Sequence, residues 1–322
     1  VVNAAGPWVD ELREINHSKE NKHLHLTKGV HIVVPYHRLP VRQAIYFDVP
    51  DGRMIFAIPR GRITYVGTTD TDYDGDKNHV FTSSTDARYL VNAVNVTFPS
   101  SHLTLADVES CWAGLRPLIH EEGKSASELS RKDEIFESES GLISIAGGKL
   151  TGYRKMSERV VDLIVKLRFS ERNLPGCTTS SIHIAGGGLQ DAHDVRKFHE
   201  LVADQVAVLG LKGDHATYLV HLYGKQAEAI IAMARNKNLS DPEIALALAE
   251  LDFALDQEMI ATAEDFLVRR TGLLYFNIHR LYKVMEPVLE NLRSKLNWSE
   301  KRMALERNAM QELITNTLHF KN

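Results

Sequence analysis

The chain has 322 residues, of which 43% are hydrophobic and 25% charged, a composition typical of a globular protein that is long enough for two domains. A formal net charge of -4 excludes a general attraction to nucleic acid or acidic membranes, so any basic site must be local. No apolar run approaches the roughly 20 residues that a membrane span needs. Cys111 and Cys177 form no CxxC motif, which predicts two free thiols in a reducing compartment.

The first residues, VVNA at 1–4, predict a strand that is already under way, and a short helical turn follows at 8–12. No initiator Met precedes them. We therefore interpret the sequence as a fragment whose N-terminal part is missing.

The segment 1–181 is rich in short apolar runs separated by Pro, Gly and Asp turns, a spacing that predicts antiparallel strands. A helix is expected at 84–96 behind the capping candidates Ser83 and Ser84. A polar, exposed loop is expected at 121–132. The strands are expected at 31–34, 44–47, 54–58, 63–67, 106–112 and 134–136.

The segment 182–322 changes in character to helix, after a linker-like AGGGLQD at 185–191. SDPE at 240–243 supplies a cap, a first-turn proline and an acid, and Thr262 and Ser299 mark further helix starts. We expect roughly four to six helices here.

The stretch LISIAGGKLTGYRKMSERVVDLIVKL at 142–167 predicts a strand, a glycine loop and an amphipathic helix. The strand ends before Gly147 and Gly148. The apolar face of the helix is predicted to comprise Tyr153, Met156, Val160, Leu163, Ile164 and Leu167.

Positive charge gathers where this helix begins, although the free amides and the dipole of a helix start already favour an anion. Lys149, Arg154 and Lys155 lie there, and the first acid is Glu158. The pattern therefore favours an anionic ligand. The alternative, that the glycines only turn the chain and the cations are solvated, stays open because the full phosphate-loop pattern GxxxxGK[ST] is lacking.

No metal site is predicted. DTDYDGD at 70–76 matches the first half of an EF-hand loop, but Phe81 stands where a bidentate Glu is required. The histidines at 23, 25, 31 and 37 lack the helical spacing of zinc enzymes.

Two arginines lie where strands are expected to meet loops, namely Arg116 in GLRPL and Arg131 in ELSRKD. Guanidinium groups bind phosphate or carboxylate in a bidentate manner, although a single arginine is more often a surface residue. Together with Lys149, they would form a small anion pocket.

Six motifs in order resemble the FAD-dependent glycerol-3-phosphate dehydrogenases, and EDFLVRRTGLLYF at 264–276 is similar to the helical C-terminal domain of that family. The motifs are NAAGPWVD at 3–10, KGVHIVVP at 28–35, VGTTDTDYDGD at 66–76, GLRPL at 114–118, ELSRKDEI at 128–135 and GGKLTGYRKMSE at 147–158.

The resemblance implies an α/β (α+β) FAD-dependent oxidoreductase-like fold. Residues 1–181 would form a mixed or antiparallel sheet substrate domain with part of the FAD-binding domain, and 182–322 an α-helical C-terminal domain. The family's GxGxxG segment, which cradles the ADP part of FAD, is absent from this sequence.

The resemblance also implies residue roles in oxidising sn-glycerol 3-phosphate to dihydroxyacetone phosphate, with hydride transfer from C2 to FAD. Arg131 would bind the phosphate. Arg116, His31 and Lys149 would face the C2 hydroxyl, with His31 as the candidate base. FAD would lie beside Ala5, Gly6, Gly147, Gly148, Lys149, Leu150 and Thr151.

The related oxidases carry a long insertion between the segments that match Arg131 and Gly147, where this chain is short, so a dehydrogenase that reduces a quinone is favoured. The resemblance implies a cytoplasmic protein, peripheral on the inner face of the membrane, that binds no nucleic acid; a homodimer is an open alternative. Two rival interpretations are an oxidase that produces hydrogen peroxide and a non-catalytic interaction module.

Overall fold

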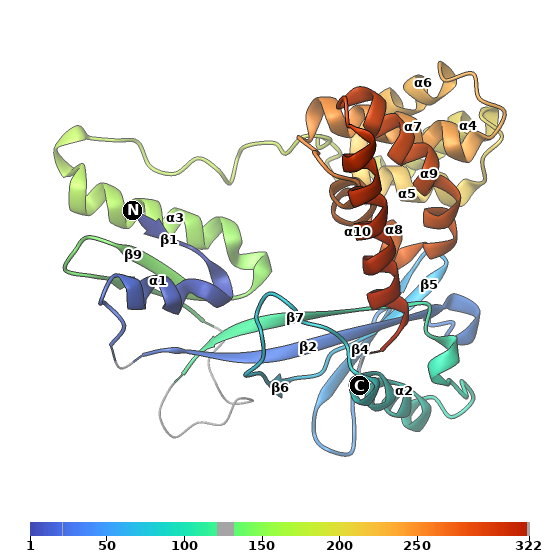
Figure 1. Cartoon of the computed structure of the whole chain (residues 1–322). Coiled ribbons are helices and arrows are strands. Elements are labelled where there is room, and N and C mark those ends of the chain that lie inside the picture. The colour runs from blue at the N-terminus through green and yellow to red at the C-terminus, as the bar shows by residue number, and fades with distance from the viewer. Residues whose placement is uncertain (21, 121–131, 321–322) are drawn as a thin grey trace. The chain divides into compact units, whose positions relative to one another are not determined.

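The computed structural model describes residues 1–20, 22–120 and 132–320, and its elements are labelled in Figure 1. The chain divides into two compact units. The first unit comprises Val1–Val30, Thr68–Phe81 and Ala113–Ile182, and the second comprises His31–Gly67, Thr82–Trp112 and His183–Asn322. The second unit thus combines the helical segment from His183 onward with two earlier segments of the chain.

A three-stranded sheet forms the centre of the first unit, in the order β1 (Val2–Asn3), β9 (Ile143–Gly147), β8 (Asp133–Glu137). β1 pairs with β9 in parallel and β8 pairs with β9 antiparallel. The helices of this unit are α1 (Val9–Ile15) and α3 (Tyr153–Arg168), with the 3-10 helices Gly6–Trp8, Leu150–Gly152 and Ser170–Arg172.

The apolar face of α3 packs on β9, as its periodicity predicts. Met156, Val160, Leu163 and Ile164 join the cluster around Ile143 and Ile145. The prediction was wrong for the two ends of the helix, because Tyr153 and Leu167 are exposed. The buried part of the face is therefore shorter than the pattern indicates.

The expected antiparallel strands are present in the order β3 (Ile45–Asp48), β4 (Met54–Arg60), β5 (Ile63–Gly67), β2 (Leu24–Pro35), and the second unit contains all of them except Leu24–Val30 of β2. Their pairing brings His31 opposite Gly67 and Phe56 opposite Gly67. In the first unit, β6 (Thr71–Asp72) pairs with the beginning of β2 at Thr27 and Lys28.

Ser83 caps the expected helix, α2 (Ser84–Thr97), through a capping box with Asp86. The strand expected at 106–112 begins later, as β7 (Ser110–Ile119). A capping box between Thr104 and Asp107 starts a 3-10 helix, Leu105–Asp107, before it. A further 3-10 helix, Tyr36–Arg38, follows β2.

The described part of the helical segment, 183–320, contains seven α-helices, more than the four to six expected. Gly224, at positive φ, separates α5 from α6, and Asn277 ends the one-turn α8 while capping α9. The elements are α4 (Ala192–Val208), α5 (Gly213–Tyr223), a 3-10 turn (Gly224–Gln226), α6 (Ala227–Arg235), α7 (Pro242–Gln257), a π-helix (Asp265–Arg270), α8 (Leu273–Phe276), α9 (Ile278–Lys295) and α10 (Glu300–Leu318).

Capping chemistry confirms two of the expected helix starts. The Asp241 side chain accepts from the amides of Glu243 and Ile244, and Ser299 caps α10. In the linker-like segment at 185–191, the Gly186 carbonyl accepts a hydrogen bond of 2.8 Å from the Lys225 amide.

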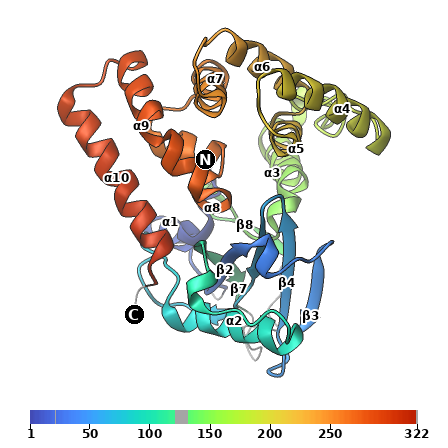
Figure 2. The same ribbon diagram turned by 90° about the vertical axis from the view of Figure 1, so that its right-hand side faces the viewer.

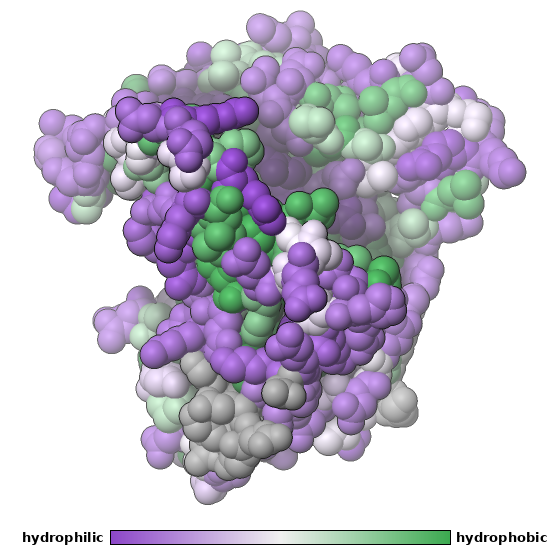
Figure 3. Space-filling model, turned by 90° about the vertical axis from the view of Figure 1, so that its left-hand side faces the viewer, coloured by the Kyte–Doolittle hydropathy of each residue, from purple (hydrophilic) through white to green (hydrophobic). Residues whose placement is uncertain are grey.

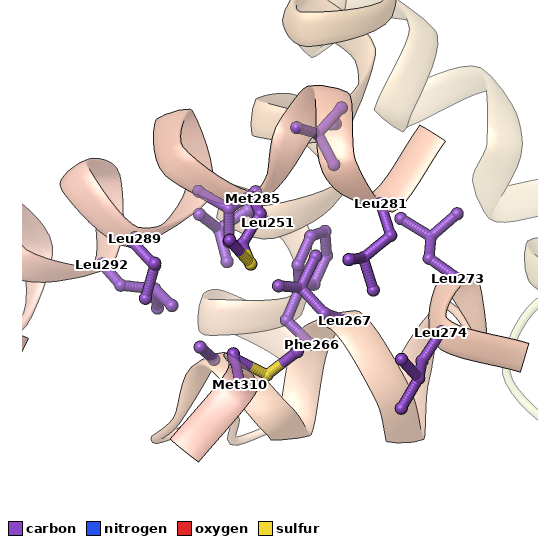
Figure 4. Packing of buried hydrophobic residues seen from close by; sticks show 14 of the residues in the cluster. Leu251, Phe266, Leu267, Leu273, Leu274, Leu281, Met285, Leu289, Leu292 and Met310 are labelled. Atoms are coloured by element: carbon purple, nitrogen blue, oxygen red, sulfur yellow. The ribbon is translucent and has the colours of Figure 1, made fainter. Parts of the chain in front are cut away.

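Apolar packing joins the helices around two cores. One core joins α4, α5, α6 and α7, and the other joins α7 to α10 (Figure 4). Figure 2 shows α9 and α10 side by side. No helix in the described residues is long and apolar enough to cross a membrane.

A buried carboxylate, Glu250 of α7, connects three helices of this segment. Its Oε1 accepts hydrogen bonds from the hydroxyls of Tyr218 (2.6 Å) and Tyr223 (3.0 Å) on α5, and its Oε2 pairs with Arg280 of α9 at 2.7 Å. Burial, followed by the charge of Glu250, raises the pKa of both tyrosines, so both hydroxyls stay protonated donors.

Candidate active site

The turn that follows β1 is held by one buried side chain, Asn3. Its amide nitrogen donates to the Val9 carbonyl (3.0 Å) and to Ser144 Oγ (3.1 Å), and its Oδ1 accepts from the Ala5 amide. Asn3 therefore ties β1 to α1 and β9. Beyond it, Gly6 has φ +56°, and no heavy atom lies within 4 Å of a Cβ built on this residue. The backbone at Gly6 is thus open to a ligand.

The glycine loop after β9 requires both of its glycines. Gly147 and Gly148 have φ values of +76° and +83°. A Cβ on Gly147 would lie 2.6 Å from the Lys132 carbonyl oxygen and 3.1 Å from Ile119 Cδ1, and a Cβ on Gly148 would lie 2.9 Å from Met156 Sδ. A side chain at either position would therefore clash with these neighbours, and the positive φ values of both residues favour glycine as well.

The strand, glycine loop and helix predicted at 142–167 are confirmed, and a 3-10 turn, Leu150–Gly152, leads into α3. Leu150 is 91% exposed. Figure 3 shows that apolar residues gather on one otherwise mostly hydrophilic face of the molecule.

The positive charge at this helix start is less concentrated than the sequence indicates. Arg154 pairs with Glu158 at 2.8 Å, and Lys155 pairs with the same carboxylate. These hydrogen bonds, that of Lys155 first, lower the pKa of Glu158. Lys149 forms no ion pair within the described residues, and the first turn of α3 has no acid. Lys149 is thus the cation available to a ligand.

The guanidinium of Arg116 in β7 is held by polar groups of residues 68–70. Its Nη2 donates to Thr68 Oγ1 (2.7 Å), and its Nη1 donates to the Thr69 carbonyl (3.1 Å) and lies 3.4 Å from Asp70 Oδ1. The guanidinium also lies directly over Gly29, where a Cβ would be 2.3 Å from Nη2. Any side chain at position 29 would displace Arg116.

The glycine loop lies beside the strand that carries Arg116. Gly147 approaches Ile119, three residues after Arg116 in β7. At about 3.3 Å per strand residue, this contact lies roughly 10 Å along the strand from Arg116. Lys149 follows Gly147 by two residues. The arrangement is compatible with the predicted anion pocket, whose third member, Arg131, lies outside the described residues.

His31, in the second unit, lies between two strands. On the side of β5, its ring covers the paired residue Gly67, where a Cβ would be 2.1 Å from His31 Cδ2. From β7, the Trp112 ring stacks on the imidazole with centroids 4.8 Å apart and an interplanar angle of 13°. The imidazole is therefore held in one orientation.

Two family models match the chain. One, of FAD dependent oxidoreductases, matches residues 1–154, and the other, of the C-terminal domain of alpha-glycerophosphate oxidase, matches 177–303. The structure resembles that of the glycerol-3-phosphate dehydrogenase from Bacillus halodurans, solved with FAD, with a TM-score of 0.87 and 44% identity over all of this chain. The chain is thus similar, over its whole length, to FAD-dependent glycerol-3-phosphate dehydrogenases.

Curated dehydrogenases are similar to this chain as well. The aerobic glycerol-3-phosphate dehydrogenase of Staphylococcus haemolyticus is 45% identical over 93% of this chain, and that of Staphylococcus aureus is 42% identical over 100% of it. The chain spans 55% and 58% of their respective lengths, and 63% of the Bacillus halodurans chain.

The site residues predicted for this chain are divided between its two units. Arg116, Lys149 and the predicted cofactor residues belong to the first unit, and His31 to the second. Sequence reasoning missed the supports Asn3, Gly29, Gly67 and Trp112. A signal existed for the two glycines, because a glycine inside a strand often marks a close approach of another group.

Proposed function

We propose that this chain carries the substrate-oxidising part of a dehydrogenase that converts sn-glycerol 3-phosphate to dihydroxyacetone phosphate, with FAD as the cofactor. The observation that carries the proposal is the match, over all of this chain, to a glycerol-3-phosphate dehydrogenase solved with FAD. The fixed guanidinium of Arg116 and the open space beside Gly6 support it.

The residues at the two turns fit FAD. Gly6 has open space beside its backbone, Leu150 presents an exposed apolar side chain, and no acid opposes an anion at the start of α3. We propose that Ala5, Gly6 and the loop Gly147, Gly148, Lys149, Leu150 and Thr151 hold the cofactor. FAD, when bound, supplies the acceptor for the hydrogen that leaves C2 with its electron pair.

The substrate would be held by cations of this chain. Arg131 would bind the phosphate, while Arg116 and Lys149 would stabilise negative charge that develops on the C2 oxygen as its proton leaves. Because Arg116 is already fixed by Thr68 and Thr69, little reorganisation is required. A guanidinium keeps its proton at ordinary pH, so Arg116 is not the base.

We propose His31 as the base that removes the C2 hydroxyl proton. Its support is the motif KGVHIVVP at 28–35, which carries His31 and resembles the corresponding segment of these dehydrogenases. Imidazole titrates near neutral pH, which suits proton transfer.

Arg131 provides the direct test of the substrate. Replacing Arg131 with Ala in the FAD-loaded protein should lower kcat/KM for glycerol 3-phosphate by about 10- to 100-fold, the cost of about 1.5–3 kcal/mol of charge-assisted hydrogen bonding. With glycerol, which has no phosphate, the loss should be under about threefold. Arg88→Ala, on the exposed side of α2, is the control. Equal losses with both substrates would remove the phosphate role.

The electron acceptor is a separate part of the proposal. We propose a quinone, reduced by a protein peripheral to the inner face of the cytoplasmic membrane. An oxidase is the second candidate, since one matching family model is named for an oxidase. Stoichiometric hydrogen peroxide under air would favour the oxidase, and quinone reduction without peroxide the dehydrogenase. Protein that binds no flavin and oxidises no substrate would indicate a non-catalytic module.

A further inference from the structure

An aromatic cluster begins at the imidazole of His31 in the second unit. Tyr65 of β5 and Trp112 of β7 contact His31, and the two last residues of α8, Tyr275 and Phe276, contact Trp112. Trp112 stacks on His31, and the Tyr65 ring lies 6.3 Å from His31 and 5.8 Å from Trp112. The proposed base thus has ring neighbours from two strands.

The position of Trp112 follows from the sheet. Val33 of β2 pairs with Tyr65 of β5 on one edge, while its carbonyl accepts from the Glu109 amide, just before β7, on the other. A strand has only two edges. Gly67 and Trp112 therefore flank His31 from opposite sides, and the ring can move toward neither without a clash.

The helical segment supports Trp112 from behind. The centroid of the Trp112 ring lies 5.4 Å from that of Tyr275 and 5.7 Å from that of Phe276. Ser110, two residues before Trp112 in β7, donates a hydrogen bond of 2.6 Å from its Oγ to the Tyr275 carbonyl. The Arg60 guanidinium lies 4.0 Å above the Phe276 ring. The Ser110 hydrogen bond and the ring contacts thus hold α8 against β7, and the Arg60 contact holds it against β4, within one compact unit.

We propose that Trp112 is a positioning residue for the His31 imidazole, and that α8 gives the helical segment its part in the reaction by supporting Trp112. This inference rests on the proposed function of His31. An offset aromatic stack restricts rotation of a ring about its own bond. A proton acceptor needs this fixed direction, because a misplacement of about 1 Å can reduce the rate by about 100-fold.

The test compares aromatic and aliphatic replacements. In the FAD-loaded protein, Trp112→Leu should lower kcat for glycerol 3-phosphate by about 10- to 100-fold while KM changes less than about threefold. Trp112→Phe keeps a flat ring and should recover kcat to within about threefold of wild type. Phe276→Leu should show a smaller loss than Trp112→Leu. Trp298→Leu, which removes a tryptophan that packs against the core of the helical segment, should leave kcat unchanged.

A spectroscopic measurement is independent of turnover. The Cε1 proton of His31, identified by its loss in His31→Gln, lies in the ring current of Trp112. Its NMR resonance should move in Trp112→Leu, move less in Trp112→Phe and stay in place in Trp298→Leu. An unmoved resonance in Trp112→Leu would overturn the stacking, whatever the activity.

The kinetic outcomes distinguish the positioning role of Trp112 from the proposed role of His31 as the base. If His31→Gln abolishes turnover while Trp112→Leu keeps wild-type kcat, the positioning role is overturned and the proposed function stands. If His31→Gln keeps wild-type kcat, both the base and its positioning residue are overturned. If wild type oxidises no glycerol 3-phosphate, the proposed function fails and the positioning role fails with it. The NMR comparison then tests only whether Trp112 stacks on His31.

Discussion

Gly67→Ala should disable the proposed base while leaving the fold in place. A Cβ at position 67 would lie 2.1 Å from His31 Cδ2 and 2.5 Å from Nε2, about 1.3 Å short of the 3.4 Å at which ordinary contact begins. The imidazole cannot retreat, since the Trp112 ring already stacks on it at 4.8 Å. The ring must therefore move by about 1 Å or rotate out of its stack.

A displacement of about 1 Å costs about 100-fold in rate, or about 2.7 kcal/mol of transition-state stabilisation. We expect kcat of the FAD-loaded Gly67→Ala variant to fall by that factor in a steady-state assay with an artificial electron acceptor. KM should change little, because His31 acts on the hydroxyl rather than holding the phosphate.

Gly213→Ala is the matched control for this change. Gly213 begins α5, and nothing lies within 4 Å of a Cβ built on it, so the same substitution should leave kcat unaltered. Unchanged far-UV circular dichroism would show that Gly67→Ala is folded. A folded Gly67→Ala protein with wild-type kcat would refute the reasoning, since the base would then tolerate displacement.

Three further changes test the strand that carries Arg116 and the buried group around Glu250. Gly114→Val should raise KM for glycerol 3-phosphate by about tenfold in steady-state kinetics, because it fills open space two residues from Arg116 on the same face of β7; an unchanged KM would contradict this. Glu250→Gln should lower the free energy of unfolding in urea by about 3–5 kcal/mol by leaving Arg280 buried without a counter-charge, whereas Glu250→Leu with Arg280→Met should be near wild type. Because the pKa of Tyr218 and of Tyr223 is raised in the folded state, stability is complete below the unfolded pKa of about 10 and falls as pH rises above it; Phe at both positions should flatten this fall in pH-dependent urea titrations.

Local chemistry predicted much of the fold. The strand, glycine loop and helix at 142–167 and the caps at Asp241 and Ser299 could be read from sequence because each depends on residues within a few positions. The same local chemistry explains one error, since the capping box of Thr104 with Asp107 delays the start of β7.

The site was predictable only in part. Motif resemblance pointed to Arg116, Lys149 and His31, whose roles stay proposals, but their supports depend on contacts between segments far apart in the chain. Trp112 stacks on His31 only because β2 and β7 lie in one sheet. Similarly, periodicity does not reveal that Glu158 pairs with Arg154 and Lys155, because that depends on side-chain rotamers.

The carboxylate of Glu250 has a consequence for how the helical segment opens. Because α5, α7 and α9 all bond to this one group, none of them can detach without exposing a buried charge or hydroxyl belonging to the others. Their amide protons should accordingly exchange with solvent as one cooperative block. The helix α8, which meets Trp112 just before α9 begins, then inherits the rigidity of that block.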